Sequence, residues 1–148
     1  MRYLVDTDVL LRYCDQDDGE HAVCVSAIRS LVAQGENVCL CAQVLIEHWA
    51  VATRPASVNG LGLDPDEADR QLAAATLALP CLPEPPDMAE RWRKVARDNA
   101  VRGKQAHDAR IVALMQSHGI SHILTLNTSD FARYQGVTPV SPAEVIAP

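Results

Sequence analysis

The feature that most constrains this chain is a regular alternation of short apolar runs with longer amphipathic stretches. Runs at residues 3–5, 37–40, 122–126 and 137–140 have the length and residue types of strands. The stretches between them repeat apolar residues at the helical period. Strands separated by helices are typical of a mostly parallel sheet. The sequence therefore predicts an α/β three-layer sandwich with a mostly parallel central sheet of four to five strands.

The helices are predicted from their period and from the residues at their ends. We expect them at residues 21–32, 44–53, 64–79, 91–101 and 105–118, with a shorter one starting at Val9 and a terminal turn capped by Ser141. The third long helix has an N-cap Asp and a first-turn Pro. Asp87 and Glu90 repeat a capping pattern ahead of the fourth.

Length and composition favour one domain that spans residues 1–148, since 48% of the residues are hydrophobic and can form a core. Arg2, Asp6 and Asp8 interrupt the first apolar run, and no later run approaches about 18 residues. We therefore expect a cytoplasmic protein with no membrane association. Cys39 and Cys41 share one side of a predicted strand and are expected to be ordinary core residues.

The net charge of −6 argues against a protein that simply coats nucleic acid, because nonspecific binding depends on Lys and Arg that neutralise phosphates. A nuclease is not excluded. The basic side chains are concentrated in one segment, at Arg91, Arg93, Lys94, Arg97, Arg102 and Lys104. This patch is either a solvated helix face or a surface for nucleic-acid backbones.

Two carboxylates occupy helix positions that are expected to face the core. Asp108 lies on the same predicted helix face as Ile111, and Glu47 lies between Val44 and Val51 on another. A buried carboxylate costs several kcal/mol unless it is paired or bound to a cation. These two acids therefore need either a basic partner or a metal ion.

Arg54 or Arg110 could supply an ion pair, which leaves a purely structural role open. Asp6 and the loop at 127–130 favour a cation instead, because both follow strands, at the edge where α/β sheets place their sites. Converging oxygen donors suit magnesium or manganese, which retain waters for the hydrolysis of a phosphodiester.

Four stretches, in order along nearly the whole chain, resemble the successive acidic motifs of VapC-type PIN-domain toxins. They are YLVDTDVLLR at 3–12, VLIEHWAVATRP at 44–55, GKQAHDAR at 103–110 and ILTLNTSDF at 123–131. Each motif alone is weak, but four in order at these intervals are specific. The resemblance implies a PIN-like α/β/α sandwich, a Mg²⁺-dependent endoribonuclease in which Mn²⁺ can substitute, a VapB-like antitoxin as partner, and a homodimer.

The resemblance also implies the site residues. It assigns catalysis and metal binding to four acids, Asp6, Glu47, Asp108 and Asp130. Three further residues have an auxiliary role: Thr7, Thr125 and Asn127. RNA backbone contacts are expected from Lys104, Arg102 and Arg97. Family members commonly have Asn where this chain has Asp8, and we favour a helix cap over a metal ligand there. Many PIN domains have a carboxylate at the position of Asn127, so the sequence leaves open whether the site binds one or two metal ions.

Three alternative functions have less support from the sequence. A zinc site is not supported, because His48 and His107 each adjoin a carboxylate in sequence and so point about 100° away from it on a helix. A phosphatase of the haloacid dehalogenase type shares an Asp-rich motif after a strand, but has Thr where this chain has Leu10. A module that binds RNA or a partner without cutting is the third, and an intact set of acids argues against it.

Overall fold

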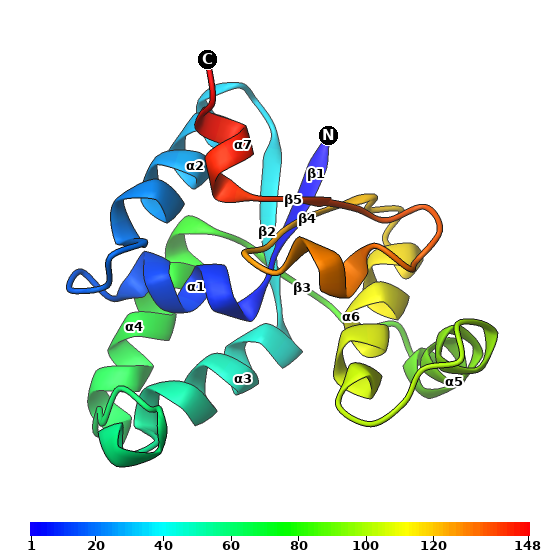
Figure 1. Cartoon of the computed structure of the whole chain (residues 1–148), viewed down its shortest axis with the longest axis horizontal. Helices are drawn as coiled ribbons and strands as arrows, with labels where there is room; N and C mark the ends of the chain where they lie inside the picture. Colours follow the sequence, from blue (N-terminus) through cyan, green and yellow to red (C-terminus); the bar gives the residue numbers. More distant parts are fainter.

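The centre of the molecule is a five-stranded parallel sheet (Figure 1), and the computed structural model describes all residues 1–148. The strand order is β3-β2-β1-β4-β5, with β1 at Arg2–Val5, β2 at Asn37–Cys41, β3 at Cys81–Leu82, β4 at His122–Leu124 and β5 at Thr138–Val140. All neighbouring strands are parallel. The predicted α/β class is confirmed, and the sheet has the expected number of strands.

Helices cover both faces of this sheet. Their bounds are α1 Thr7–Cys14, α2 His21–Ala33, α3 Ala42–Thr53, α4 Pro65–Ala78, α5 Met88–Asp98, α6 Gln105–Ser117 and α7 Pro142–Ile146, with short 3₁₀ turns η1 Ala56–Val58 and η2 Thr128–Phe131. Contacts divide the α-helices into two groups, because α1 to α4 and α7 pack in one chain of neighbours whereas α5 packs on α6.

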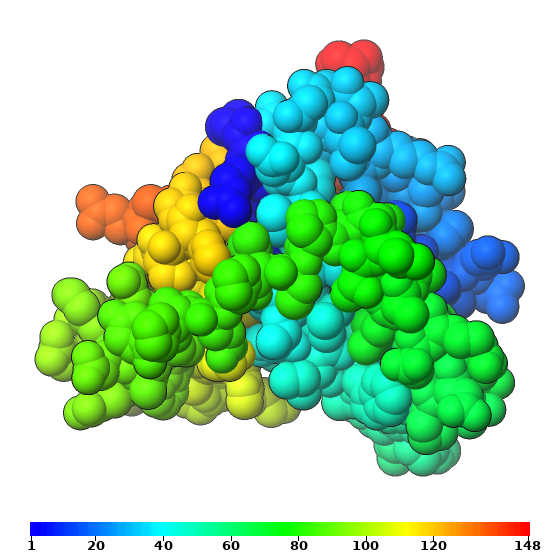
Figure 2. Space-filling view, turned by 180° about the vertical axis from the view of Figure 1, so that it is seen from behind, coloured from blue at the N-terminus to red at the C-terminus, as the bar shows by residue number.

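The two groups follow from the handedness of parallel crossovers, which is almost always right-handed. The chain moves outward from β1 through β2 to β3 and then crosses back to β4, so α5 and α6 fall on the opposite face from α1 to α4. The result is the predicted three-layer sandwich. Seen from the front and from behind, α4 and α5 lie at opposite sides of the molecule (Figure 1 and Figure 2).

Strand β1 lies at the middle of the hydrophobic core. Leu4 and Val5 are completely buried, and Cys39 and Cys41 of β2 are buried beside them, as predicted for core thiols. All five cysteines are free. None of the helices combines the length and the hydropathy that crossing a membrane requires.

Most predicted helices end within two residues of the observed bounds, but α5 is displaced by three residues toward the N-terminus. It ends in a Schellman motif, in which the Val101 amide donates to the Ala96 carbonyl oxygen at 2.9 Å while Ala100 has a positive φ of 50°. Alanine, and not the glycine that usually marks such a C-terminus, takes the positive φ here, so local sequence rules do not predict where α5 ends.

The side-chain cap bond predicted at Asp87 is not formed, whereas the cap predicted at Ser141 is confirmed and is a capping box with Glu144. Asp87 occupies the N-cap position of α5, but its side chain accepts no backbone cap bond. Its Oδ1 accepts instead from Arg91 Nε at 2.8 Å. An arginine one turn later therefore competes for the carboxylate that sequence reasoning assigned to the helix end.

Candidate active site

The candidate site begins where β1 and β4 end, at the point where the strand order reverses direction. Asp6 follows β1 and Thr125 follows β4, and Thr125 Oγ1 donates to Asp6 Oδ2 at 2.8 Å. Asp6 also caps α1, because its Oδ1 accepts from the Thr7 amide at 2.8 Å. The structure thus fixes Asp6 at the sheet edge predicted for it.

The structure corrects the cap that we favoured for Asp8. Asp6 is the N-cap of α1, and Asp8 lies in the first turn. Its Oδ2 accepts from the Leu126 amide at 3.1 Å and from Asn127 Nδ2 at 3.0 Å. Asp8 therefore links helix α1 to the loop between β4 and η2. Its other oxygen, Oδ1, is buried and has no hydrogen-bond partner.

Glu47 is held from two directions. Its Oε2 accepts from Thr7 Oγ1 at 2.6 Å, and its Oε1 accepts from Gln43 Nε2 at 3.0 Å. Gln43 is only 6% exposed, and its Nε2 also donates to the His107 carbonyl oxygen at 2.7 Å. Glu47 on α3 is therefore connected to α1 directly and to α6 through Gln43.

The buried face of α3 differs from the predicted one. Val44 is buried as expected, but His48 is buried with it, while Ala50 is exposed and Glu47 lies half-buried at the border. Apolar residues occur on every side of this helix, so their period could not fix which face turns inward. Glu47 lies at the candidate site, as predicted, although the helix face on which that prediction relied is not the observed one.

Asp108 lies in the first turn of α6, half-buried, and its carboxylate takes part in no hydrogen bond or ion pair within the chain. Arg110, one proposed partner, instead pairs with Glu84 and donates from Nη1 to Gln43 Oε1 at 2.9 Å. Arg54, the other, forms no ion pair. The structural explanation by ion pairing is therefore wrong.

Burial and mutual repulsion raise the pKa of two of the acids. Burial, followed by the charges of Asp8 and Asp108, raises the pKa of Asp6 to about 7, although hydrogen bonds from neighbouring groups oppose the shift. Burial, followed by the charges of Asp130 and Glu47, raises the pKa of Asp108 to about 6. These carboxylates form one electrostatic cluster, which we call the acidic cluster: Asp6, Asp8, Glu47, Asp108 and Asp130. A bound cation would offset its repulsion.

The acidic cluster suits a hard cation, because all of its donors are oxygens and none of them forms an ion pair with a basic side chain. No three acidic, histidine or cysteine side chains stand close enough together to coordinate one ion directly. Magnesium, however, is usually held by one or two carboxylates and several waters. The residues therefore fit an ion that is bound partly through water, and the partnerless Asp8 Oδ1 offers one more acceptor.

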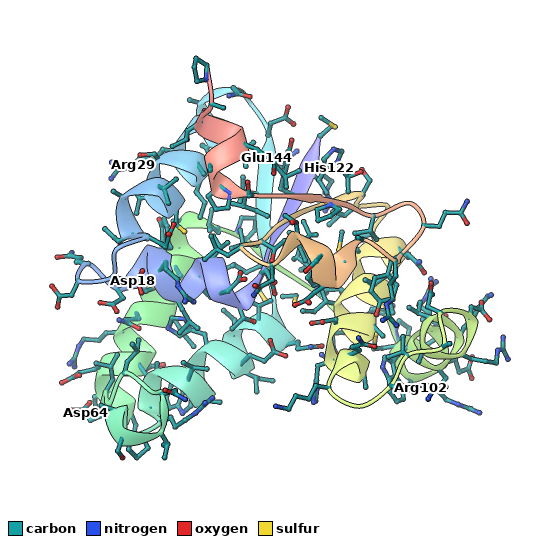
Figure 3. The ribbon with its side chains drawn as sticks, in the orientation of Figure 1. Asp18, Arg29, Asp64, Arg102, His122 and Glu144 are labelled. Carbon is teal, nitrogen blue, oxygen red and sulfur yellow. The ribbon has the colours of Figure 1, made fainter.

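The basic patch is less available than the sequence indicates. Arg97 Nε lies 3.3 Å from Asp98 Oδ1, and Lys94 Nζ lies 2.6 Å from Asp98 Oδ2. Arg102 and Lys104 are exposed and form no ion pair. Arg102 lies on the connection between α5 and α6 (Figure 3), and Lys104 directly precedes α6, the helix that carries Asp108.

Sequence reasoning missed Gln43 and Tyr134. Gln43 is a polar residue four positions before Glu47, and this helical spacing could have indicated a contact. Tyr134 is 3% exposed and its hydroxyl has no hydrogen-bond partner. Burial raises the pKa of Tyr134, and the charges of Asp108 and Asp130 add to the shift, so this ring lies beside the acidic cluster.

Comparison with known proteins places this arrangement in a family. The family model described as PIN domain matches residues 3–137. Among solved structures, VapBC2 from Rickettsia felis, bound to a promoter DNA fragment, has 12% identity and a TM-score of 0.71 over 95% of this chain and 98% of that chain. VapBC-1 from nontypeable Haemophilus influenzae has 15% identity and a TM-score of 0.70 over 97% and 99% of the two chains.

A third similar structure is VapC20 from Mycobacterium tuberculosis, described as a toxin that cleaves the sarcin-ricin loop. It has 19% identity and a TM-score of 0.59 over 82% of this chain and 86% of that chain. A comparison with curated protein sequences gave no match.

The fold and the site define a class of protein, a parallel α/β sandwich with an acidic centre at the carboxyl edge of its sheet. The family match covers most of the chain and identifies that class. The chain belongs to the PIN-domain family.

Proposed function

We propose that this protein is a magnesium-dependent endoribonuclease of the VapC type, the toxin of a VapBC-type toxin–antitoxin pair. The observation that carries the proposal is the acidic cluster at the end of β1 and β4, which has no basic partner. The chain belongs to the PIN-domain family, which supports the assignment as a nuclease. The similar fold of VapC20, a toxin described as cleaving the sarcin-ricin loop, supports RNA as the substrate.

The residues that would hold the ion, directly or through water, are Asp6, Glu47, Asp108 and Asp130. When bound, magnesium, or manganese in its place, would acidify a water and neutralise charge on the scissile phosphate. Thr125 and Thr7 orient the acids, because their hydroxyls donate to Asp6 and Glu47 and leave the remaining lone pairs free for ligands. Cleavage of cellular RNA would then inhibit translation and growth.

RNA backbone contacts are proposed for Lys104 and Arg102, which lead into α6 and have no intrachain partner. Arg97 contributes less, because Asp98 already offsets part of its charge. These contacts would position the RNA without distinguishing its sequence, since phosphates are the same at every nucleotide.

The partners proposed are a VapB-like antitoxin and a second copy of the chain. The antitoxin is supported by similar structures, among them a toxin–antitoxin complex from Klebsiella pneumoniae and a DNA-bound VapBC from Salmonella typhimurium. Exposed apolar side chains such as Val58 (51% exposed) and Leu77 (91% exposed) support the presence of a protein partner. Light scattering of the isolated chain and of the co-expressed pair measures both associations.

The deciding experiment incubates wild type and Asp6→Asn with total RNA, in Mg²⁺ and in excess EDTA. We expect cleavage only by wild type with metal, because the amide removes one hard ligand while asparagine still caps α1 well. Asp66→Asn is the matched control, since Asp66 is an exposed acid on the distant helix α4. Cleavage in EDTA, or undiminished cleavage by Asp6→Asn, would refute the mechanism.

The other functions find less support. The Leu10 position, where a haloacid-dehalogenase phosphatase has its threonine, is completely buried in the core. A module that binds RNA without cutting would gain nothing from several unpaired carboxylates, because they repel phosphates.

A further inference from the structure

A hollow of about 420 Å³ opens between α3 and α6, directly beside the acidic cluster. Gln43, Ile46, Glu47, His107 and Arg110 line it. Glu47 belongs to both the hollow and the cluster, and the charge of His107 lowers the pKa of Asp108, so the two sites are adjacent. Figure 1 shows the two helices that carry these residues, α3 and α6, near the carboxyl ends of the strands.

The walls of the hollow differ from those of a phosphate site. Arg110 is the one permanent cation there, and it is paired with Glu84. The carboxylate of Glu47 faces the same space. Because two carboxylates accompany one guanidinium, the hollow offers no surplus positive charge to an anion.

The same walls suit a flat, neutral ring. Ile46 is 66% exposed and gives an apolar surface, and the His107 ring is exposed with no side-chain hydrogen bond. The Arg110 guanidinium keeps donors beyond those used on Gln43 and Glu84, and its side chain is 33% exposed. Single-stranded RNA is commonly read by bases that stack on histidine or arginine planes and accept hydrogen bonds at their edges.

We propose that this hollow binds one nucleobase of the RNA substrate, next to the scissile phosphate. Gln43 couples base binding to the reaction centre, because its amide donates both to Glu47 and to the α6 backbone while Arg110 donates to it. A base against Arg110 therefore touches the residues that hold Glu47 in place. The substrate assignment rests on the proposed ribonuclease function, but the binding itself can be measured without cleavage.

The first test is NMR titration of wild type in EDTA with uridine, cytidine and adenosine, and separately with inorganic phosphate. We expect the nucleosides to shift the Ile46 methyl and His107 ring signals, and phosphate to leave them unchanged. His107→Ala and Ile46→Ala should weaken nucleoside binding by about fivefold or more, as for loss of one stacking surface. Gln105→Ala, an exposed neighbour on α6 outside the hollow, should bind as wild type does.

The second test uses RNA in which each nucleotide flanking the cleavage position is replaced in turn by an abasic one. For wild type, one such replacement should lower kcat/KM about tenfold, whereas His107→Ala should already have lost this factor and respond little. Shifts caused by phosphate but not by nucleosides would overturn the proposal in favour of an anion site. Absence of nucleoside shifts would overturn it outright, whereas nucleoside binding by a protein that does not cut RNA would contradict only the proposed function.

Discussion

In metal-free protein, Asp108→Asn should increase the free energy of unfolding near pH 8, although it removes a residue of the proposed site. Asp108 has no hydrogen-bond or ion-pair partner to lose, and burial with the charges of Asp130 and Glu47 raises its pKa from 3.8 to about 6. A rise of that size corresponds to about 3 kcal/mol against the ionised folded form. Because the side chain is only half-buried, solvent screening reduces the expected gain to about 1–2 kcal/mol.

The sign and the pH window follow from the raised pKa of Asp108. The folded state holds its proton more tightly than the unfolded chain, so the penalty is fully present above pH about 6, declines as pH falls toward 3.8 and is absent below that value. The advantage of Asp108→Asn should therefore be largest at pH 8 and mostly lost by pH 4.5. Neutralising the remote Asp66 in Asp66→Asn should show no such pH dependence.

Urea denaturation in EDTA at pH 8, 6 and 4.5 measures the effect. Added Mg²⁺ should then stabilise wild type more than the variant, because an ion that binds only the folded state stabilises it by mass action. A variant that is less stable than wild type at pH 8, or a difference that does not change with pH, would refute the repulsion within the acidic cluster.

Three further predictions concern single side chains. Asp8→Asn should retain cleavage, because the amide oxygen can still accept hydrogen bonds from Asn127 and Leu126. Asp8→Leu cannot accept them, so it should loosen the loop after β4 and lower kcat at least tenfold, which turnover assays of the two variants measure. Ala100→Gly should raise the free energy of unfolding by about 0.5–1 kcal/mol in urea melts, because glycine accepts the positive φ of the α5 stop without strain, and a loss of stability would contradict this. Tyr134→Phe should leave the free energy of unfolding unchanged or raise it by up to about 1 kcal/mol, because the Tyr134 hydroxyl is buried without a hydrogen-bond partner. A marked fall in the thermal midpoint would contradict this and indicate that the hydroxyl is hydrogen-bonded to a buried water.

The sequence was sufficient to predict the order and type of the main elements, because the long helices and the strands each carry an apolar period of their own. It was also sufficient to predict the positions of two acids: Asp6 directly after a strand, and Asp108 near the start of a helix. The inward face of α3 was not predictable, since Val44, His48 and Ala50 differ in burial for reasons that depend on α1 and α4.

The role of Asp8 could not be predicted for a related reason. Asp6 and Asp8 are both suitable caps for α1 by local rules. What separates them is a partner that is distant in sequence, just after the neighbouring strand β4: Asp8 accepts from Leu126 and Asn127, while Asp6 caps the helix. Likewise, Arg110 was a plausible partner for Asp108 until β3 placed Glu84 within its reach. Long-range neighbours decide such choices, and a single sequence does not contain them.

The bond between Thr125 and Asp6 joins residues that are 119 positions apart in the chain. Closing so long a loop is entropically costly and slow, and it requires β4 to pair in register with β1. A nascent chain whose first hundred residues have left the ribosome therefore has Asp6 and Glu47 but neither Asp108 nor the strand that anchors Asp6. The acidic centre therefore forms only after β4 has paired with β1, when most of the chain has been synthesised.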